Sequence, residues 1–183
     1  IAYAESIDAV PQNLAEVQPT FLVSVPRIYE KVYARVLDTV AKSSPLRQKL
    51  FHWGVEVGRR RSLKLLAGQP VPGWLEFQYS IASELVFSKL RQRMGGRVRF
   101  MVSGGAPLGA SLALFFHAAG LTIIEGYGLT ETSPVISCNR LERIKLGTVG
   151  QPIPGLEVRI ADDGEILVKG PSVMLGYYRD EAA

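Results

Sequence analysis

Cysteine and histidine are scarce in this 183-residue sequence, and their scarcity removes several classes of chemistry. Its one cysteine, Cys138, excludes an internal disulfide and any zinc site built from several thiolates. Its two histidines, His52 and His117, fall within predicted helices and leave little for a nucleophilic triad or a histidine-rich metal site. A single cysteine is typical of a reducing compartment, so the expected location is cytoplasmic.

Charged residues are absent from one long stretch, residues 101–124. Its length alone is compatible with a membrane span. However, the string "SGGAPLG" interrupts it with three glycines and a proline, which favours strand, turn, helix and strand in a soluble core. Any contact with a membrane is therefore expected to be peripheral.

The overall charge is only mildly basic. Lys and Arg number 21 against 17 Asp and Glu, a net charge of +4 that favours anionic ligands weakly and does not indicate nucleic acid. The basic cluster of Arg59, Arg60, Arg61 and Lys64 is interpreted as the solvated face of a helix, with an anionic lipid or partner surface as the alternative. The sequence opens on Ile1 without a visible signal peptide, so we expect an internal piece of a longer protein.

The hydrophobic pattern predicts an α/β fold with a partly parallel sheet flanked by helices. A strand is expected at 20–25, followed by a helix with Pro26 at its first position. The apolar face of that helix is predicted to hold Ile28, Val32, Val36, Leu37 and Val40. Two further helical blocks, 46–66 and 74–94, form a predicted helical insert at about 45–95.

Residues 98–125 predict a strand, helix, strand unit. The strands "VRFMV" and "LTIIE" flank the helix "ASLALFFHAA", which Gly120 closes. The crossover is long enough to make the strands parallel, and parallel strands end on the same edge of a sheet. The turns "SGGAP" and "GYGLTE" are therefore expected on one side, where open α/β sheets bind ligands.

The sequence pattern changes after Cys138, where turn residues and short alternating strands replace the helices. The string "LEVRIADDGEILVKGP" predicts two antiparallel strands joined at a turn of Asp163 and Gly164. We therefore divide the chain into an α/β part, 1–138, and a small antiparallel β subdomain, 139–183.

The stretch "EGYGLTETSP", residues 125–134, has the composition of a nucleotide site. Its glycines let a ligand approach the backbone, Tyr127 offers a flat face for a purine, and Thr130 offers a hydroxyl to phosphate. Glu131 is a carboxylate suited to Mg²⁺ held jointly with phosphate. A tight turn beside a packed tyrosine is the alternative. The sequence contains neither a phosphate loop with its lysine nor a GxSxG motif.

Three blocks then resemble those of the adenylate-forming enzymes, in that family's order: "SGGAPL", "YGLTETSP" and "GEILVKGPSVMLGYY". The string "SVPRIYEKV", with the helical insert after it, is similar to the long-chain fatty acyl-CoA synthetases. This resemblance implies a fragment of the large N-terminal domain of such a ligase. The implied reaction joins a fatty acid to ATP as acyl-AMP and then transfers the acyl group to coenzyme A, with Mg²⁺ as the cofactor.

The resemblance also implies roles for individual residues. Thr130 and Glu131 are the expected catalytic residues, for phosphate and for the metal respectively. Glu125 stands where a contact to the adenine amino group is expected, and Leu129, Thr132 and Gly105 border the acyl group. The remaining nucleotide-binding residues are Gly104, Gly105, Ala106 and Pro107 in the adenine-side loop, and Gly126, Tyr127 and Gly128 beside the base.

Other elements of the resembled family do not occur in these 183 residues: its phosphate loop, its ribose-binding aspartate and its C-terminal lysine. We therefore expect these residues alone to be catalytically inert. Two alternatives stay open, an acyl-adenylating enzyme for another acid and a non-catalytic nucleotide-binding or interaction module. No oligomeric state is predicted.

Overall fold

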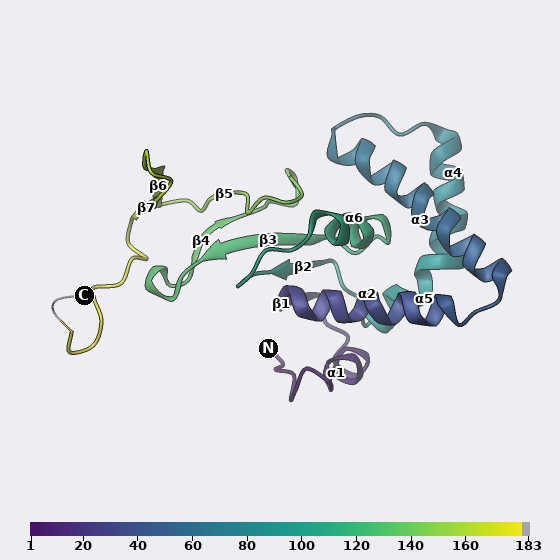
Figure 1. The fold of residues 1–183 in the computed structure, drawn as a ribbon, viewed down its shortest axis with the longest axis horizontal. Helices are drawn as coiled ribbons and strands as arrows, with labels where there is room; N and C mark the ends of the chain where they lie inside the picture. Colours follow the sequence, from purple (N-terminus) through teal and green to yellow (C-terminus); the bar gives the residue numbers. More distant parts are fainter. Residues whose placement is uncertain (181–183) are drawn as a thin grey trace.

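The computed structural model describes residues 1–180; the last three residues of the predicted 139–183 subdomain lie outside them. A five-stranded sheet in the order β1-β2-β3-β4-β5 forms the centre of the molecule (Figure 1). Its first three strands are parallel: β1 (Phe21–Ser24), β2 (Phe100–Ser103) and β3 (Ile123–Gly128). Two antiparallel strands continue it: β4 (Val135–Cys138) and β5 (Gln151–Pro152).

A separate antiparallel hairpin follows, made of β6 (Glu157–Ile160) and β7 (Ile166–Lys169). The turn between them uses Gly164 at a φ of +92°, as the Asp163, Gly164 pattern predicts. The α/β class, the partly parallel sheet and the small antiparallel sheet are thus confirmed. The division at residue 138 stays a prediction, and β5 extends the main sheet beyond it.

The helices begin and end close to the sequence signals. Proline lies in the first turn of the first three helices, where its missing N–H costs no hydrogen bond. The predicted block 74–94 is one helical rod with a π-helical turn, η1 (Ser83–Phe87), inside it. The helices are α1 (Val10–Val17), α2 (Pro26–Ala41), α3 (Pro45–Leu66), α4 (Gly73–Ala82), α5 (Ser88–Arg93) and α6 (Ala110–Ala118).

The core lies between α2, α6 and one face of the parallel strands. Tyr29 of α2 is completely buried, packs edge-on against Phe116 of α6, and donates a 2.8 Å hydrogen bond to the carbonyl of Val102. Tyr29 is not among the residues predicted for this face, and the prediction of Leu37 there is wrong, since Leu37 is exposed. The helix turns its aromatic residues inward because they bury more apolar area.

The opposite face of the parallel strands is open. In β1, Phe21 and Val23 are 54% and 65% exposed, while Met101 of β2 is completely buried on the covered face. The ring of Phe21 stacks on that of Phe100, with the centroids 6.0 Å apart. This pair therefore forms an apolar patch on the surface of the described chain.

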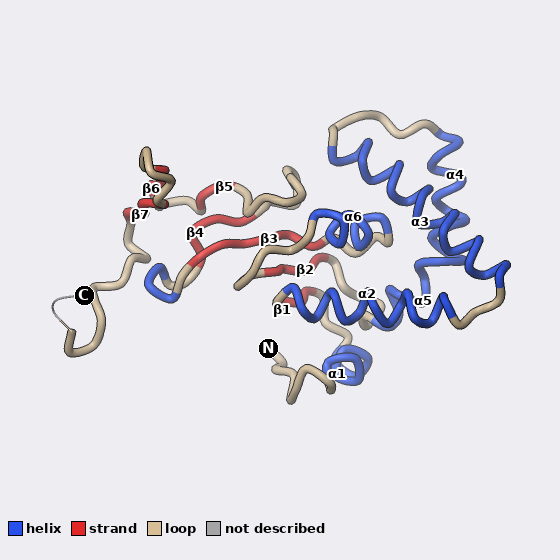
Figure 2. Tube along the Cα trace, viewed as in Figure 1, coloured by secondary structure: helices blue, strands red, loops and turns tan. Residues whose placement is uncertain are grey.

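Helices α3, α4 and α5 form the predicted insert, at the end of the molecule opposite β6 and β7 (Figure 2). The imidazole of His117 in α6 lies 2.9 Å from the hydroxyl of Ser62, which satisfies this partly buried histidine. Burial lowers the pKa of His117, so the ring is neutral near pH 7. No helix among residues 1–180 combines the length and apolarity that crossing a bilayer requires.

Candidate functional site

The two segments selected from the sequence meet at the carboxyl ends of β2 and β3. Ser103 and Glu125 are paired in register, and the loop 104–109 leaves β2 directly after this pair. The loop starts beside β3, since a Cβ on Gly104 would lie in ordinary contact, 3.7 Å from the carbonyl oxygen of Gly126. This edge points away from the helical insert (Figure 1). The prediction that both segments open on one side of the sheet is confirmed.

The second segment is a strand for longer than predicted. Gly126 to Gly128 continue β3 beyond the predicted strand, so the prediction of a turn at these three residues is wrong. They remain extended because β4 pairs with them antiparallel, with Tyr127 opposite Ser137. The chain turns only after Leu129, whose own backbone is still extended. Tyr127 is accordingly half-buried, held by a strand on its far side rather than carried on a mobile loop.

Glu125 is buried, with 6% of its surface exposed, and its carboxylate oxygen Oε1 accepts a 3.1 Å hydrogen bond from the backbone N–H of Leu108. The side chain thereby ties the loop 104–109 to β3. Beside it, the hydroxyl of Ser103 is buried without a hydrogen-bond partner among the described residues. The contact that the structure gives Glu125 is with the protein backbone, which identifies it as a residue that shapes the loop.

The glycines at this edge differ in how much space the fold leaves for a side chain. A Cβ at Gly128 would lie 1.7 Å from the carbonyl oxygen of Pro134, so the fold itself excludes a side chain there. At Gly126 the nearest atom, the carbonyl oxygen of Ser137, would be 3.5 Å away, which is an ordinary contact. Gly104 is equally roomy. The fold does not require glycine at Gly126 or Gly104, which leaves the close approach of a ligand as a reason for it.

A short 3-10 turn, η2 (Thr130–Thr132), carries the hydroxyl and carboxylate groups. The hydroxyl of Thr132 is buried, donating to the carbonyl of Pro134 at 2.7 Å and accepting from the N–H of Leu129 at 3.1 Å. Thr132 therefore locks the turn instead of presenting its hydroxyl to solvent. Leu129 and Thr130 are exposed, as are Gly105, Ala106 and Pro107 of the facing loop.

Glu131 has a partner that sequence analysis missed. The hydroxyl of Tyr177 donates a 2.7 Å hydrogen bond to Oε1 of Glu131, and the N–H of Met174 donates to its backbone carbonyl at 2.8 Å. The hydrogen bond from Tyr177, together with one from the backbone N–H of Glu131 itself, lowers the pKa of the Glu131 carboxyl group. The carboxylate is therefore ionised at neutral pH. Tyr177 belongs to the block "GEILVKGPSVMLGYY", whose only signal was its resemblance to a family block.

Glu131 is the carboxylate that would coordinate a divalent cation at this edge. Residues 1–180 contain no group of three or more His, Cys, Asp and Glu residues placed to hold a metal ion. Magnesium is commonly bound through one or two carboxylates together with substrate phosphates. A single ionised carboxylate next to the hydroxyl of Thr130 fits that mode, in which the phosphates supply the other ligands.

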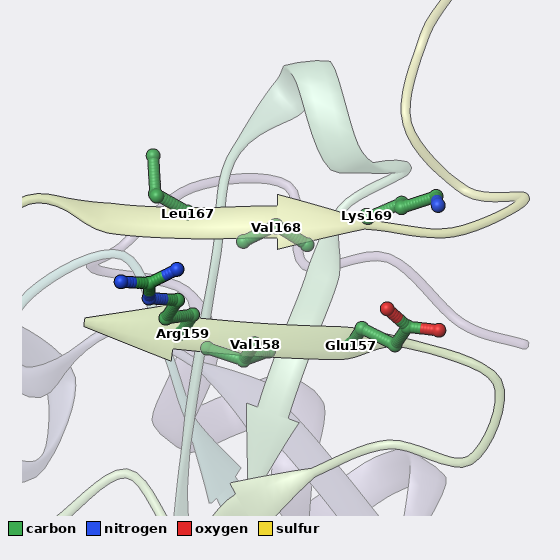
Figure 3. Close-up of a pocket in the computed structure, with 6 residues that line it drawn as sticks. All are labelled: Glu157, Val158, Arg159, Leu167, Val168 and Lys169. Atoms are coloured by element: carbon green, nitrogen blue, oxygen red, sulfur yellow. The ribbon is translucent and has the colours of Figure 1, made fainter. Parts of the chain in front are cut away.

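One surface hollow lies elsewhere, over the β6 and β7 hairpin (Figure 3). Figure 3 shows Glu157 and Lys169 at one end of it and Arg159 near the other. The hollow is the open face of two paired strands and contains none of the sequence-predicted site residues. Its full lining is Glu157, Val158, Arg159, Leu167, Val168 and Lys169.

On the expectation from the sequence that this edge binds ATP, replacing Glu125 by Ala should raise the KM for ATP by about tenfold or more while changing kcat less. The reason is that a hydrogen bond to a buried carboxylate contributes about 1.5–3 kcal/mol and here fixes the loop. Steady-state kinetics on the protein at its full natural length measures the split between the two constants. Glu125→Gln keeps an acceptor oxygen for the N–H of Leu108 and should restore most of the KM. Equal losses in both variants would contradict a positioning role.

The AMP-binding enzyme family matches residues 2–178. The chain is 42% identical over 183 residues to the long-chain-fatty-acid–CoA ligase FadD15 of Mycobacterium bovis, covering 100% of this chain and 30% of that protein. It is 36% identical to the peroxisomal long chain acyl-CoA synthetase 6 of Arabidopsis thaliana, covering 92% of this chain and 25% of that one. The chain thus spans about 30% of the length of the first of these relatives.

Solved structures show the same fold at lower identity. A benzoate CoA ligase from Burkholderia xenovorans superposes with a TM-score of 0.58 at 22% identity, over 98% of this chain and 28% of that one. The O-succinylbenzoate coenzyme A synthetase of Bacillus subtilis, solved with ATP and a magnesium ion, gives 0.53 at 20% identity, over 97% and 28%.

Proposed function

This chain belongs to the AMP-binding enzyme family, and from that premise we propose that the protein activates a long-chain fatty acid with ATP and transfers it to coenzyme A. The single observation that supports the proposal most is the meeting of the loop 104–109 with residues 125–131 at one edge of the sheet. The fatty acid is favoured over other acids because the relatives at 42% and 36% identity are a long-chain-fatty-acid–CoA ligase and a long chain acyl-CoA synthetase.

In the proposed first step, a carboxylate oxygen of the fatty acid attacks the α-phosphorus of ATP. The new P–O bond gives acyl-AMP as the bond to pyrophosphate breaks. Tyr127 lies against the base, and Gly126 leaves room for the base beside the strand. Thr130 donates its hydroxyl to a phosphate oxygen, and Glu131 holds magnesium, which when bound neutralises phosphate charge.

In the proposed second step, the thiol of coenzyme A attacks the acyl carbonyl carbon. A thioester bond forms, the bond to the AMP phosphate breaks, and AMP leaves with the electron pair. Gly105 and Leu129, both exposed at the edge, border the acyl carboxyl group in this proposal. Thr132 acts behind them by fixing the turn that carries Leu129 and Thr130.

The rest of the proposal concerns organisation. The α/β part, 1–138, supplies the edge described above, and the part from 139 onward supplies Tyr177. We propose that the whole protein works in the cytoplasm. Magnesium enters with ATP, and no nucleic acid takes part.

The proposal is tested by exchange of labelled pyrophosphate into ATP, measured on the protein at its full natural length. Exchange should depend on a long-chain fatty acid, and acyl-CoA should appear only when coenzyme A is added. Benzoate, supplied at equal concentration, is the matched control and should support far less exchange. Exchange with benzoate but not with the fatty acid would replace the substrate, and no exchange with any carboxylic acid would favour a non-catalytic nucleotide-binding module.

A further inference from the structure

The helical insert carries a row of large apolar side chains on its outer surface. Trp74, Phe77, Ile81 and Leu85 are 58%, 68%, 38% and 59% exposed. Their spacing of three, four and four residues places them along one side of the continuous rod formed by α4 and η1. We refer to these four residues as the insert stripe. Contiguous exposed apolar side chains mark sites of interaction with proteins or membranes, whereas single scattered ones need no explanation.

The other side of the same rod is buried against the rest of the described structure. Leu75, Ala82 and Phe87 are buried at 2%, 0% and 1% exposure. Helix α3 approaches this side so closely that a Cβ on its Gly54 would lie 2.6 Å from Val86. The rod is therefore held rigidly from one side, and the insert stripe faces away from the α3 contact. The insert itself lies at the end of the molecule away from the β6 and β7 hairpin (Figure 1).

Positive charge accompanies the stripe. Residues 45–93 hold nine Lys and Arg against three Asp and Glu, a net charge of +6 in a chain whose total is +4. The same helical row continues beyond Leu85 into Lys89 and Arg93, which are exposed and form no ion pair with any described residue. One acidic residue, Glu84, lies beside the row.

The basic cluster found in the sequence contributes less than its composition suggests. Arg59 and Arg60 both pair with Glu56, at 2.8 and 2.7 Å. Arg61 pairs with Glu76 at 2.9 Å and stacks over the ring of Tyr79, so it links α3 to α4 within the insert. Among the described residues of the insert, Lys89 and Arg93 at the end of the stripe form no ion pair, and neither do Arg47, Lys49 and Lys64 elsewhere on it.

We propose that the insert stripe docks on the surface of an anionic lipid bilayer. A rigid helix with exposed Trp, Phe, Ile and Leu on one side and Lys and Arg at its end has the composition of an interfacial membrane helix. The apolar side chains enter the boundary between headgroups and acyl chains, and Lys89 and Arg93 contact lipid phosphates. In this arrangement the helix lies along the membrane surface. The proposal goes beyond the catalytic activity, because a site for fatty acid activation does not require a bilayer.

Vesicle sedimentation tests the proposal with the protein at its full natural length, without ATP or fatty acid. Binding should be strong to vesicles containing phosphatidylglycerol, weaker to phosphatidylcholine alone, and reduced by high salt. The double variant Phe77→Ser with Leu85→Ser should bind about tenfold less or weaker still, since it removes two large apolar side chains. Leu175→Ser is the matched control, because Leu175 is a fully exposed leucine far along the chain.

The charge component has its own pair of variants. Lys89→Gln with Arg93→Gln should weaken binding to anionic vesicles by about tenfold and leave binding to phosphatidylcholine unchanged. Arg159→Gln with Lys169→Gln, on the β6 and β7 hairpin, removes the same charge elsewhere and should have no comparable effect. Circular dichroism and the thermal midpoint check that each variant is folded.

Tryptophan fluorescence locates the contact. Lipids brominated in the acyl chain should quench the protein's emission, and Trp74→Phe should reduce that quenching while Trp53→Phe, on α3, should not. Absence of vesicle binding, or binding that the stripe variants do not change, overturns the proposal. The proposal is also overturned if the protein does not bind vesicles but self-associates, and the stripe variants abolish that self-association. Because no step of this assay needs catalysis, its failure leaves the proposed ligase activity untouched, and the reverse also holds.

Discussion

Replacing Glu131 by Gln in the protein at its full natural length is expected to lower fatty-acid-dependent pyrophosphate exchange by about a hundredfold or more. Glu131 is the one ionised carboxylate on the η2 turn, and its amide replacement is similar in size but lacks the charge that a divalent cation needs. The loss should persist at saturating ATP, since the charge acts on the phosphates as they react. Glu165→Gln, an exposed residue of the hairpin turn, controls for the loss of one negative charge.

Tyr177 provides a graded version of the same test. Its hydroxyl bonds to Oε1 of Glu131, and removing a hydrogen-bond donor behind a metal ligand costs about tenfold or more in metal affinity. Tyr177→Phe should therefore raise the magnesium concentration that gives half-maximal activity, with a smaller effect on the rate at saturating magnesium. The neighbouring Tyr178, 86% exposed, supplies the control Tyr178→Phe. If Glu131→Gln retained full exchange activity, Glu131 would not be the metal ligand.

Gly128→Ala is expected to destabilise the protein by about 3 kcal/mol. The new Cβ would lie 1.7 Å from the carbonyl oxygen of Pro134, an atom that accepts hydrogen bonds from the N–H of Leu129 and the hydroxyl of Thr132. Relieving the clash moves Pro134 and breaks the bonds that close the turn. Denaturant unfolding, followed by circular dichroism, measures the loss.

The matched control for Gly128→Ala is Gly126→Ala, two residues earlier in the same strand. There the nearest atom to a Cβ would be 3.5 Å away, so stability should stay within about 0.5 kcal/mol of the parent. If a nucleotide base lies against this strand, Gly126→Ala should weaken ATP binding without unfolding the protein. Equal destabilisation by the two substitutions would show that the crowding at Gly128 relaxes without cost.

Local sequence patterns were sufficient for most of the secondary structure. Alternation, proline in the first helical turn and the Asp163, Gly164 turn act over a few residues, so they can be recognised without knowing the rest of the fold. The crossover argument was also sufficient to bring the loop 104–109 beside Glu125, because the length of a connection determines whether two strands can be parallel.

Contacts between distant residues could not be predicted in this way. The strand through Gly128 is longer than its glycines suggest because β4 pairs with it, and glycine is a weak strand former by itself. Tyr29 is inward rather than Leu37 because α6 offers it an aromatic partner. Tyr177 reaches Glu131 across 46 residues, and no periodicity in either segment signals that bond. The roles of the site residues stay a prediction from the family resemblance. The structure adds the hydrogen bonds that Glu125 and Glu131 make within the protein.

The open face of β1 affects how the polypeptide behaves at high concentration. β1 is the edge strand of its sheet, and its outward side chains Phe21 and Val23 are mostly exposed. An edge that offers unpaired backbone groups next to exposed apolar side chains is a template for strand addition by another molecule. We therefore expect aggregation through β1, rather than weakness of the buried core around Tyr29 and Phe116, to limit the solubility of these residues when they are produced alone.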